Sequence, residues 1–186
     1  FFMGLCGINF NVYFFLLIRH FKEAFACEEM RVYLGVIAAS TLAVAGNIFH
    51  LYGNVWQSLR YSFFQVASII TTTGYATTDF NMWPTFSKAV LVLLMFFGAC
   101  AGSTGGGIKT TTIFVLAQEI RCIFSKQRPG AFRRALPANA IAKASTIGLL
   151  GMLVVCCTTF LLCILEPGLP FISLLFEAVS AYSTAG

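Results

Sequence analysis

The fold is decided by one stretch, Ser68-Ile69-Ile70-Thr71-Thr72-Thr73-Gly74-Tyr75-Ala76-Thr77-Thr78-Asp79, which places a T-x-G-Y motif inside a strongly apolar sequence. Extended Thr/Gly segments of this kind form potassium filters, in which backbone carbonyls replace the hydration shell of the ion. Gly74 suits such a strand, because turning successive carbonyls toward one axis needs backbone angles that a Cβ makes strained. An ordinary Thr-Gly turn uses the same residues, so the motif alone leaves both interpretations open.

The composition is that of a membrane protein. Hydrophobic residues make up 58% of the 186 residues and charged residues only 10%, with a mean hydropathy of +0.83. Soluble domains carry roughly 25% charged residues, so this chain cannot cover a water-facing surface. The net charge of +5 does not indicate a nucleic-acid partner, because the basic residues are few and lie in loops. The seven cysteines have no framework spacing and are expected to be reduced, buried thiols.

Two kinds of apolar segment alternate along the chain. Residues 32–51 and 144–165 are free of charge and long enough to span a bilayer as helices. Residues 55–70 and 170–182 are shorter or more polar, and each runs into a Thr- and Gly-containing stretch. Non-helical backbone at membrane depth is tolerated only where it lines a cavity. We therefore expect two re-entrant helices, each followed by a filter strand.

A glycine run interrupts a third apolar stretch, residues 89–108, whereas residues 1–18 are expected to be the end of a membrane helix. The run Gly102-Ser103-Thr104-Gly105-Gly106-Gly107 should break a helix locally, which favours a flexible gate. A small-residue face for helix packing is one alternative. A phosphate-binding loop is another, but the Walker spacing fails because Ile108 precedes Lys109.

The distribution of basic residues gives the orientation. Segments 19–31 and 119–143 hold nine of the twelve Lys and Arg residues, so both are expected on the cytoplasmic side. The two re-entrant helices would then enter from outside. Segment 119–143 is also a candidate for contact with anionic membrane lipid or with a cytoplasmic partner.

The filter sequence occurs twice. A shift of 112 residues superimposes Phe64 on Phe176, Ser68 on Ser180, Thr72 on Thr184 and Gly74 on Gly186. The repeating unit is a span, a re-entrant helix, a filter strand and a second span, in an all-α integral membrane fold of which about one and a half units are present. The expected segments are 1–30 (the end of a preceding inner helix and a loop), 31–125 (a complete repeat), 126–142 (a basic cytoplasmic loop) and 143–186 (the next repeat up to its filter).

Three segments, 71–80, 98–109 and 180–186, resemble the Trk/Ktr/HKT superfamily of potassium transporters. The resemblance covers nearly the whole chain and is greatest to the bacterial Trk-type membrane subunit, from the end of its second repeat to the filter of its fourth. It implies a pseudo-fourfold pore of four non-identical repeats in a longer chain, so this piece alone is not expected to conduct. It also implies a homodimer in the cytoplasmic (inner) membrane, a cytoplasmic regulatory subunit that binds nucleotides, and a gating loop below the filter.

The resemblance and the repeat together give the candidate site. Potassium, the transported ion, would be coordinated at Thr72, Thr73, Gly74, Tyr75, Thr184, Ala185 and Gly186, and the gating loop would comprise Gly102, Ser103, Thr104, Gly105, Gly106, Gly107 and Lys109. The re-entrant helices would point their partly negative C-terminal ends at the ion. At the second filter, a plain helix-ending Gly186 is the alternative. Asp79 would raise the cation concentration at the outer mouth, or is simply a solvated acid.

Other classes of function fit the residues less well. No His and acid cluster, nucleophile motif or metal-ligand spacing is present, so an enzyme is not expected, and no cofactor is expected in this chain. A protein that only packs in the membrane would not explain two re-entrant segments. Within transport, a sodium-dependent Ktr-type subunit and a less selective monovalent cation channel stay open. Each filter has a single glycine and Ala76 takes the second position, which predicts looser selectivity over sodium.

Overall fold

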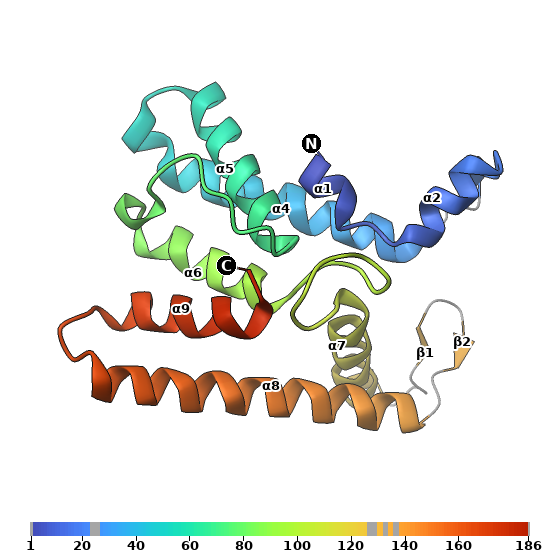
Figure 1. Cartoon of the computed structure of the whole chain (residues 1–186). Helices are drawn as coiled ribbons and strands as arrows, with labels where there is room; N and C mark the ends of the chain where they lie inside the picture. Colours follow the sequence, from blue (N-terminus) through green and yellow to red (C-terminus); the bar gives the residue numbers. More distant parts are fainter. Residues whose placement is uncertain (1, 23–26, 126–129, 132–133, 136–137, 186) are drawn as a thin grey trace.

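The computed structural model describes residues 2–22, 27–125, 130–131, 134–135 and 138–185. Within these ranges the chain is helical, apart from loops, one 3-10 turn and a short hairpin (Figure 1). The elements are α1 (Phe2–Cys6), α2 (Phe10–Leu17), α4 (Glu28–Tyr52), α5 (Val55–Ile70), η1 (Phe80–Met82), α6 (Thr85–Phe96), α7 (Thr110–Ser125), β1 (Gly130–Ala131), β2 (Arg134–Ala135), α8 (Ala138–Leu165) and α9 (Phe171–Ser183).

Both predicted spans are helices. Among the described residues, Glu29–Tyr52 and Ala142–Leu165 are long and apolar enough to cross a membrane, with mean hydropathies of 1.8 and 2.6. On α8 the large apolar side chains of Leu153, Phe160 and Leu165 are 52%, 69% and 74% exposed. A bilayer would cover such side chains, whereas water would not favour them. The predicted all-α architecture is confirmed, and the β1–β2 hairpin in the predicted basic loop is a small departure from it. The rest of that loop lies partly outside the described residues.

Each candidate span packs against a helix that is too short to cross a bilayer. Helix α5 has 16 residues and α9 has 13. At 1.5 Å per residue they reach about 24 Å and 20 Å, less than the hydrocarbon core of about 30 Å. Gly53 ends α4 in the left-handed conformation, and the Asn54 side chain accepts from the Trp56 N–H at 3.0 Å to begin α5. Figure 1 shows the second pair, α8 and α9, lying side by side.

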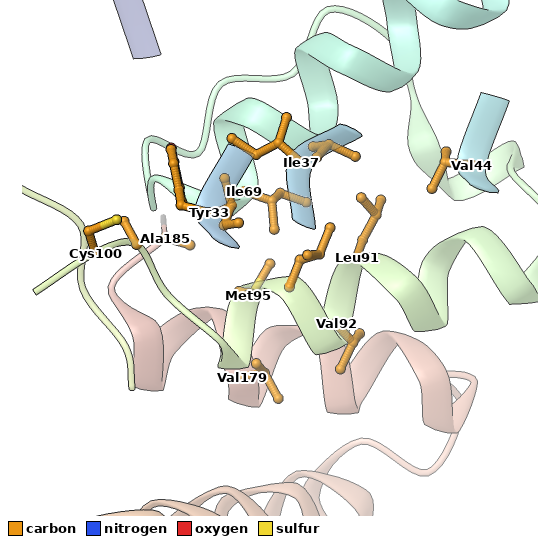
Figure 2. Packing of buried hydrophobic residues seen from close by; sticks show 14 of the residues in the cluster. Tyr33, Ile37, Val44, Ile69, Leu91, Val92, Met95, Cys100, Val179 and Ala185 are labelled. Atoms are coloured by element: carbon orange, nitrogen blue, oxygen red, sulfur yellow. The ribbon is translucent and has the colours of Figure 1, made fainter. Parts of the chain in front are cut away.

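Helix α6 fills the space between the α4–α5 pair and α9. Its Leu91 and Met95 side chains are 0% and 2% exposed and belong to the same buried cluster as Ile69 of α5. Figure 2 shows Cys100 and Ala185 at one end of this cluster. The core therefore continues from the helices to the loop that follows α6 and to the segment that follows α9.

The two predicted inner helices are broken earlier than the sequence indicates. The helix predicted over residues 1–18 is not continuous in the described range 2–18, because the chain bends at residues 7–9 and restarts at α2, where Asn9 accepts from the Asn11 N–H at 3.0 Å. Asparagine favours such N-caps over helix interiors. Helix α6 ends at Phe96, ahead of the glycine run. Residues 97–109 therefore form one loop, called the glycine loop below.

Candidate ion-conduction site

Residues 71–76, called the first filter segment after their predicted role, leave the C-terminal end of α5 through a fixed set of hydrogen bonds. The Thr71 hydroxyl donates to the Ala67 carbonyl at 2.7 Å. The Thr72 N–H donates to the Ile69 carbonyl at 3.0 Å, and the Thr73 N–H donates to the Ser68 carbonyl at 2.8 Å. These bonds satisfy carbonyls that the helix end would otherwise leave unpaired. They also set the direction in which the strand leaves the helix.

The backbone of this segment alternates in handedness. Thr72 has φ +52° and Gly74 has φ +78°. Such alternation lets carbonyls on successive residues face one side of a strand. A residue with a Cβ in the left-handed region costs about 1–2 kcal/mol, and a β-branched residue there is an outlier. Strain of this kind persists where the surroundings impose it, and it concentrates at functional sites.

Residues 183–185, called the second filter segment after their predicted role, repeat this geometry. Thr184 has φ +58°, like Thr72. The Ser183 hydroxyl donates to the Val179 carbonyl at 2.7 Å, and the Ala185 N–H donates to the Ser180 carbonyl at 3.0 Å. Each bond matches one at the position 112 residues earlier. Because the left-handed residue is a threonine, a plain helix-ending glycine does not describe this turn. Gly186 lies outside the described residues.

The strand after Thr72 is open on one side. Thr73, Gly74 and Ala76 are exposed, and the Tyr75 side chain is 72% exposed. The buried Ser68 hydroxyl donates to the Tyr75 carbonyl at 2.6 Å, which ties the far end of the strand back to α5. Of the carbonyls predicted to bind ions here, that of Tyr75 is therefore already engaged by the protein.

A cavity of about 580 Å³ lies against α9 and the second filter segment. It is lined by Phe176, Glu177, Ser180, Ala181 and Thr184. The exposed Glu177 side chain of α9 thus borders the same space as Thr184, which ends that helix. A carboxylate at such a position favours a cation in the cavity.

The glycine loop folds back on itself between α6 and α7. The Gly98 N–H donates to the Ile108 carbonyl at 2.9 Å, and the Ile108 N–H donates to the Phe96 carbonyl at 3.3 Å. A Cβ at Gly98 would collide with the Gly106 carbonyl. Gly102 and Gly107 have φ +71° and +69°, which glycine adopts without strain. The loop therefore returns the chain close to the point at which α6 ended.

The loop packs against the first residues of both filter segments. The Gly106 N–H donates to the Thr72 hydroxyl oxygen at 2.8 Å. A Cβ at Gly106 would collide with the Ser183 carbonyl and the Thr184 hydroxyl. The Lys109 ammonium donates to the Gly105 carbonyl, which places a positive charge at the same junction. The contacts reach Thr72 and Thr184 rather than Tyr75, so the loop covers the ends of the filter segments that are nearest to α5 and α9.

The other side of the loop docks on the bend at residues 7–9. The Phe10 N–H donates to the Gly102 carbonyl at 3.1 Å, and the Cys100 N–H donates to the Gly7 carbonyl at 3.2 Å. The Thr104 hydroxyl donates to the Cys6 carbonyl at 3.2 Å. Ser103 stays within the loop, because its hydroxyl donates to the Cys100 carbonyl at 2.6 Å. The sequence did not predict this junction.

Asp79 lies beyond the first filter segment and is exposed. Its carboxylate accepts from the Asn81 N–H at 2.9 Å and so begins η1. A helix-capping role and a role in attracting cations are compatible, because both use the carboxylate at the surface. The structure thus gives Asp79 a local function that the sequence interpretation omitted.

The TrkH family of cation transport proteins matches residues 40–186. The Trk system potassium uptake protein TrkH of Salmonella typhimurium is 36% identical over 123 residues, covering 63% of this chain and 25% of the relative. The Ktr system potassium uptake protein B of Bacillus subtilis is 29% identical over 191 residues, covering 97% of this chain and 42% of the relative.

The crystal structure of the potassium transporter TrkH from Vibrio parahaemolyticus superimposes with a TM-score of 0.86 at 24% identity. It matches 100% of this chain, which spans 42% of the length of that structure. The matched part of the chain therefore covers from 25% to 42% of the length of these relatives. The fold is that of this solved structure, and both the matching family and the solved neighbour are transporters rather than enzymes. With the family matched over residues 40–186, the chain belongs to the TrkH family of cation transport proteins.

Proposed function

We propose that this chain forms part of a potassium-uptake pore in the cytoplasmic membrane. The observation that carries the proposal is the matched pair of filter segments, in which Thr72 and Thr184 share a left-handed backbone and the same hydrogen bonds to the preceding helix. The relatives in the Trk and Ktr systems are named potassium uptake proteins, which supports the choice of ion.

In this proposal, backbone carbonyls replace the hydration shell of the ion. The candidates are those of Thr72, Thr73 and Gly74 in one segment and of Thr184 and Ala185 in the other. The C-terminal ends of α5 and α9 add negative potential at the start of each segment. The potential of the helix ends adds to that of the Glu177 carboxylate, which lines the cavity beside Thr184. Ala76, where strict filters have a second glycine, supports moderate selectivity over sodium.

The glycine loop is the proposed gate. It is packed against Thr72 and Thr184, and Lys109 sits on the Gly105 carbonyl at the same place. A loop and a positive charge at the end of a cation path both oppose conduction. Flow therefore needs the loop to leave the filter segments, and a cytoplasmic, nucleotide-binding regulatory subunit acting on a homodimer would control that movement.

A Ktr-type, sodium-dependent subunit is the second candidate. The observation that favours it is the match to the Bacillus subtilis Ktr protein, which extends over 97% of this chain. Dependence of uptake on sodium in the full-length protein would distinguish it from a Trk-type subunit.

The test is rubidium uptake by the full-length parent protein in cells that lack their own potassium uptake. Gly74→Ser and Gly74→Asp should abolish uptake or potassium preference while membrane expression stays normal. Gly53→Ser is the matched control, because Gly53 also has a positive φ, of +63°, but lies between α4 and α5 with open space around it. Unchanged uptake and selectivity in both Gly74 variants would mean that residues 71–76 are an ordinary turn.

A further inference from the structure

One carboxylate joins three separate parts of the molecule. Glu29, in the first turn of α4, accepts from the Ala101 N–H through Oε1 at 2.7 Å. Its Oε2 accepts from the Asn9 side-chain amide at 3.2 Å. Ala101 belongs to the glycine loop, and Asn9 belongs to the bend before α2. The same side chain lines a small cavity with Thr110 and Thr111, where the loop enters α7.

This arrangement differs from an ordinary acid at a helix start. Such acids interact with the free N–H groups of their own helix, whereas Glu29 reaches a loop amide 72 residues away. Hydrogen bonds from a backbone N–H to a carboxylate are roughly twice as strong as those between neutral groups. Asn9 is fixed in orientation, because its Oδ1 already accepts from the Asn11 N–H at 3.0 Å and its Nδ2 must therefore face Glu29.

We propose that Glu29 is a positioning residue that latches the glycine loop in its packed state. Its carboxylate clamps Ala101 to Asn9, so the loop leaves the filter segments only when this bridge opens. The inference rests on the proposed function for its link to ion flow. It adds a residue that couples the gate to the beginning of α4 and to the bend of the preceding repeat.

Cys100 supplies a built-in reporter of the latch. It precedes Ala101, its side chain is 0% exposed, and its N–H is bonded to the Gly7 carbonyl at 3.2 Å. Figure 2 shows it packed at the end of the buried cluster near Ala185. Movement of the loop away from the bend would expose its thiol, whereas a variant that keeps the loop in place would leave it protected.

The test uses reciprocal exchange of donor and acceptor across the bridge in the full-length protein. In Glu29→Gln, the new amide cannot accept from both Ala101 and Asn9 in the present geometry. Asn9→Asp keeps the cap on α2 but sets two carboxylates against each other. The double variant restores both bonds, because the introduced glutamine would donate its N–H to the introduced aspartate while its side-chain carbonyl accepts from Ala101. Glu166→Gln changes an exposed acid after α8 and is the control.

Two readouts are needed, both without the regulatory subunit. The first is the rate at which a membrane-impermeant maleimide modifies Cys100 when the other cysteines are serine, and the second is rubidium flux into vesicles. Each single variant should raise both by about 10-fold, the effect of losing one hydrogen bond to a charged group. The double variant should return the modification rate and the flux to within about 3-fold of the parent, because both hydrogen bonds are restored.

The latch is overturned if Glu29→Gln leaves Cys100 as protected as in the parent and in Glu166→Gln. It is also overturned if the double variant stays as reactive as the single ones, or if Cys100 becomes reactive without a rise in flux. Absence of rubidium flux in the parent, with the regulatory subunit present, would count instead against the proposed function. In that case the Cys100 rates still decide whether Glu29 holds the loop.

Discussion

Gly106→Ala tests whether packing of the glycine loop limits ion flow. The added methyl group would collide with the Ser183 carbonyl and the Thr184 hydroxyl, and backbone atoms cannot move aside as a flexible side chain can. Displacing the loop also breaks the hydrogen bond from Gly106 to Thr72 at 2.8 Å. Overpacking costs about 1–3 kcal/mol and the hydrogen bond about 1 kcal/mol. The packed state should therefore lose about 2–4 kcal/mol, which moves the ratio of open to packed loop about 30- to 700-fold.

The assay is rubidium uptake in cells that lack both their own potassium uptake and the regulatory subunit. Gly106→Ala should raise this unregulated uptake, whereas Gly46→Ala should not. Gly46 lies within α4 with no atom within 4 Å of an added Cβ, so alanine there favours the helix by about 0.5–1 kcal/mol. Uptake in Gly106→Ala equal to that of the parent would refute the reasoning. So would a loss of potassium preference without extra flux, because the second filter segment would then have moved instead of the loop.

Two further substitutions test single hydrogen bonds. Thr72→Val keeps the branched shape and the backbone carbonyl but removes the acceptor for the Gly106 N–H. It should raise unregulated rubidium uptake about 5- to 150-fold, whereas Thr72→Ser, which keeps the hydroxyl, should not. Equal uptake in the two variants would contradict the role of the hydroxyl. Asn47→Ala removes the acceptor for the fully buried Ser87 hydroxyl, which donates to the Asn47 side chain at 2.8 Å. It should lower the free energy of unfolding in detergent by about 1–3 kcal/mol and leave uptake per folded molecule unchanged. A variant as stable as the parent would show that this hydrogen bond contributes nothing to stability.

The long and the short helices could be predicted because hydropathy and charge act locally. A charge-free run long enough to cross the bilayer gives α4 and α8, and polar residues within 55–70 mark α5 as a helix that stops part-way. The bend at residues 7–9 could not be predicted in this way, because apolar residues continue on both sides of it. Asn9 is a local signal for a helix start, but the packing of the bend is tertiary, since a Cβ at Gly7 would collide with the Tyr33 side chain of α4.

The filter segments could be predicted as a repeat, but the residue that bears the strain could not. The sequence interpretation assigned the unusual backbone angles to glycine, the residue that adopts them most easily. In the structure Thr72 and Thr184 also adopt them, because hydroxyl and amide bonds to the preceding helix hold each turn. Likewise, no pattern in the sequence connects Glu29 with Ala101, since their contact depends on how α4 lies against the loop.

The glycines of the loop serve close packing more than flexibility, and this changes how a gate built from them would work. The sequence predicted that consecutive glycines melt the helix. In the structure Gly98 and Gly106 are needed because a Cβ at either would strike backbone atoms, while Gly102 and Gly107 supply positive φ angles. A loop held by such contacts has no stable intermediate position that keeps only part of them, because packed interfaces tend to be bistable rather than continuously deformable. A gate of this kind should therefore switch between a packed and a released state, and variants that add one methyl group at Gly106 or remove one bond at Glu29 should change the populations of these states rather than the degree of opening.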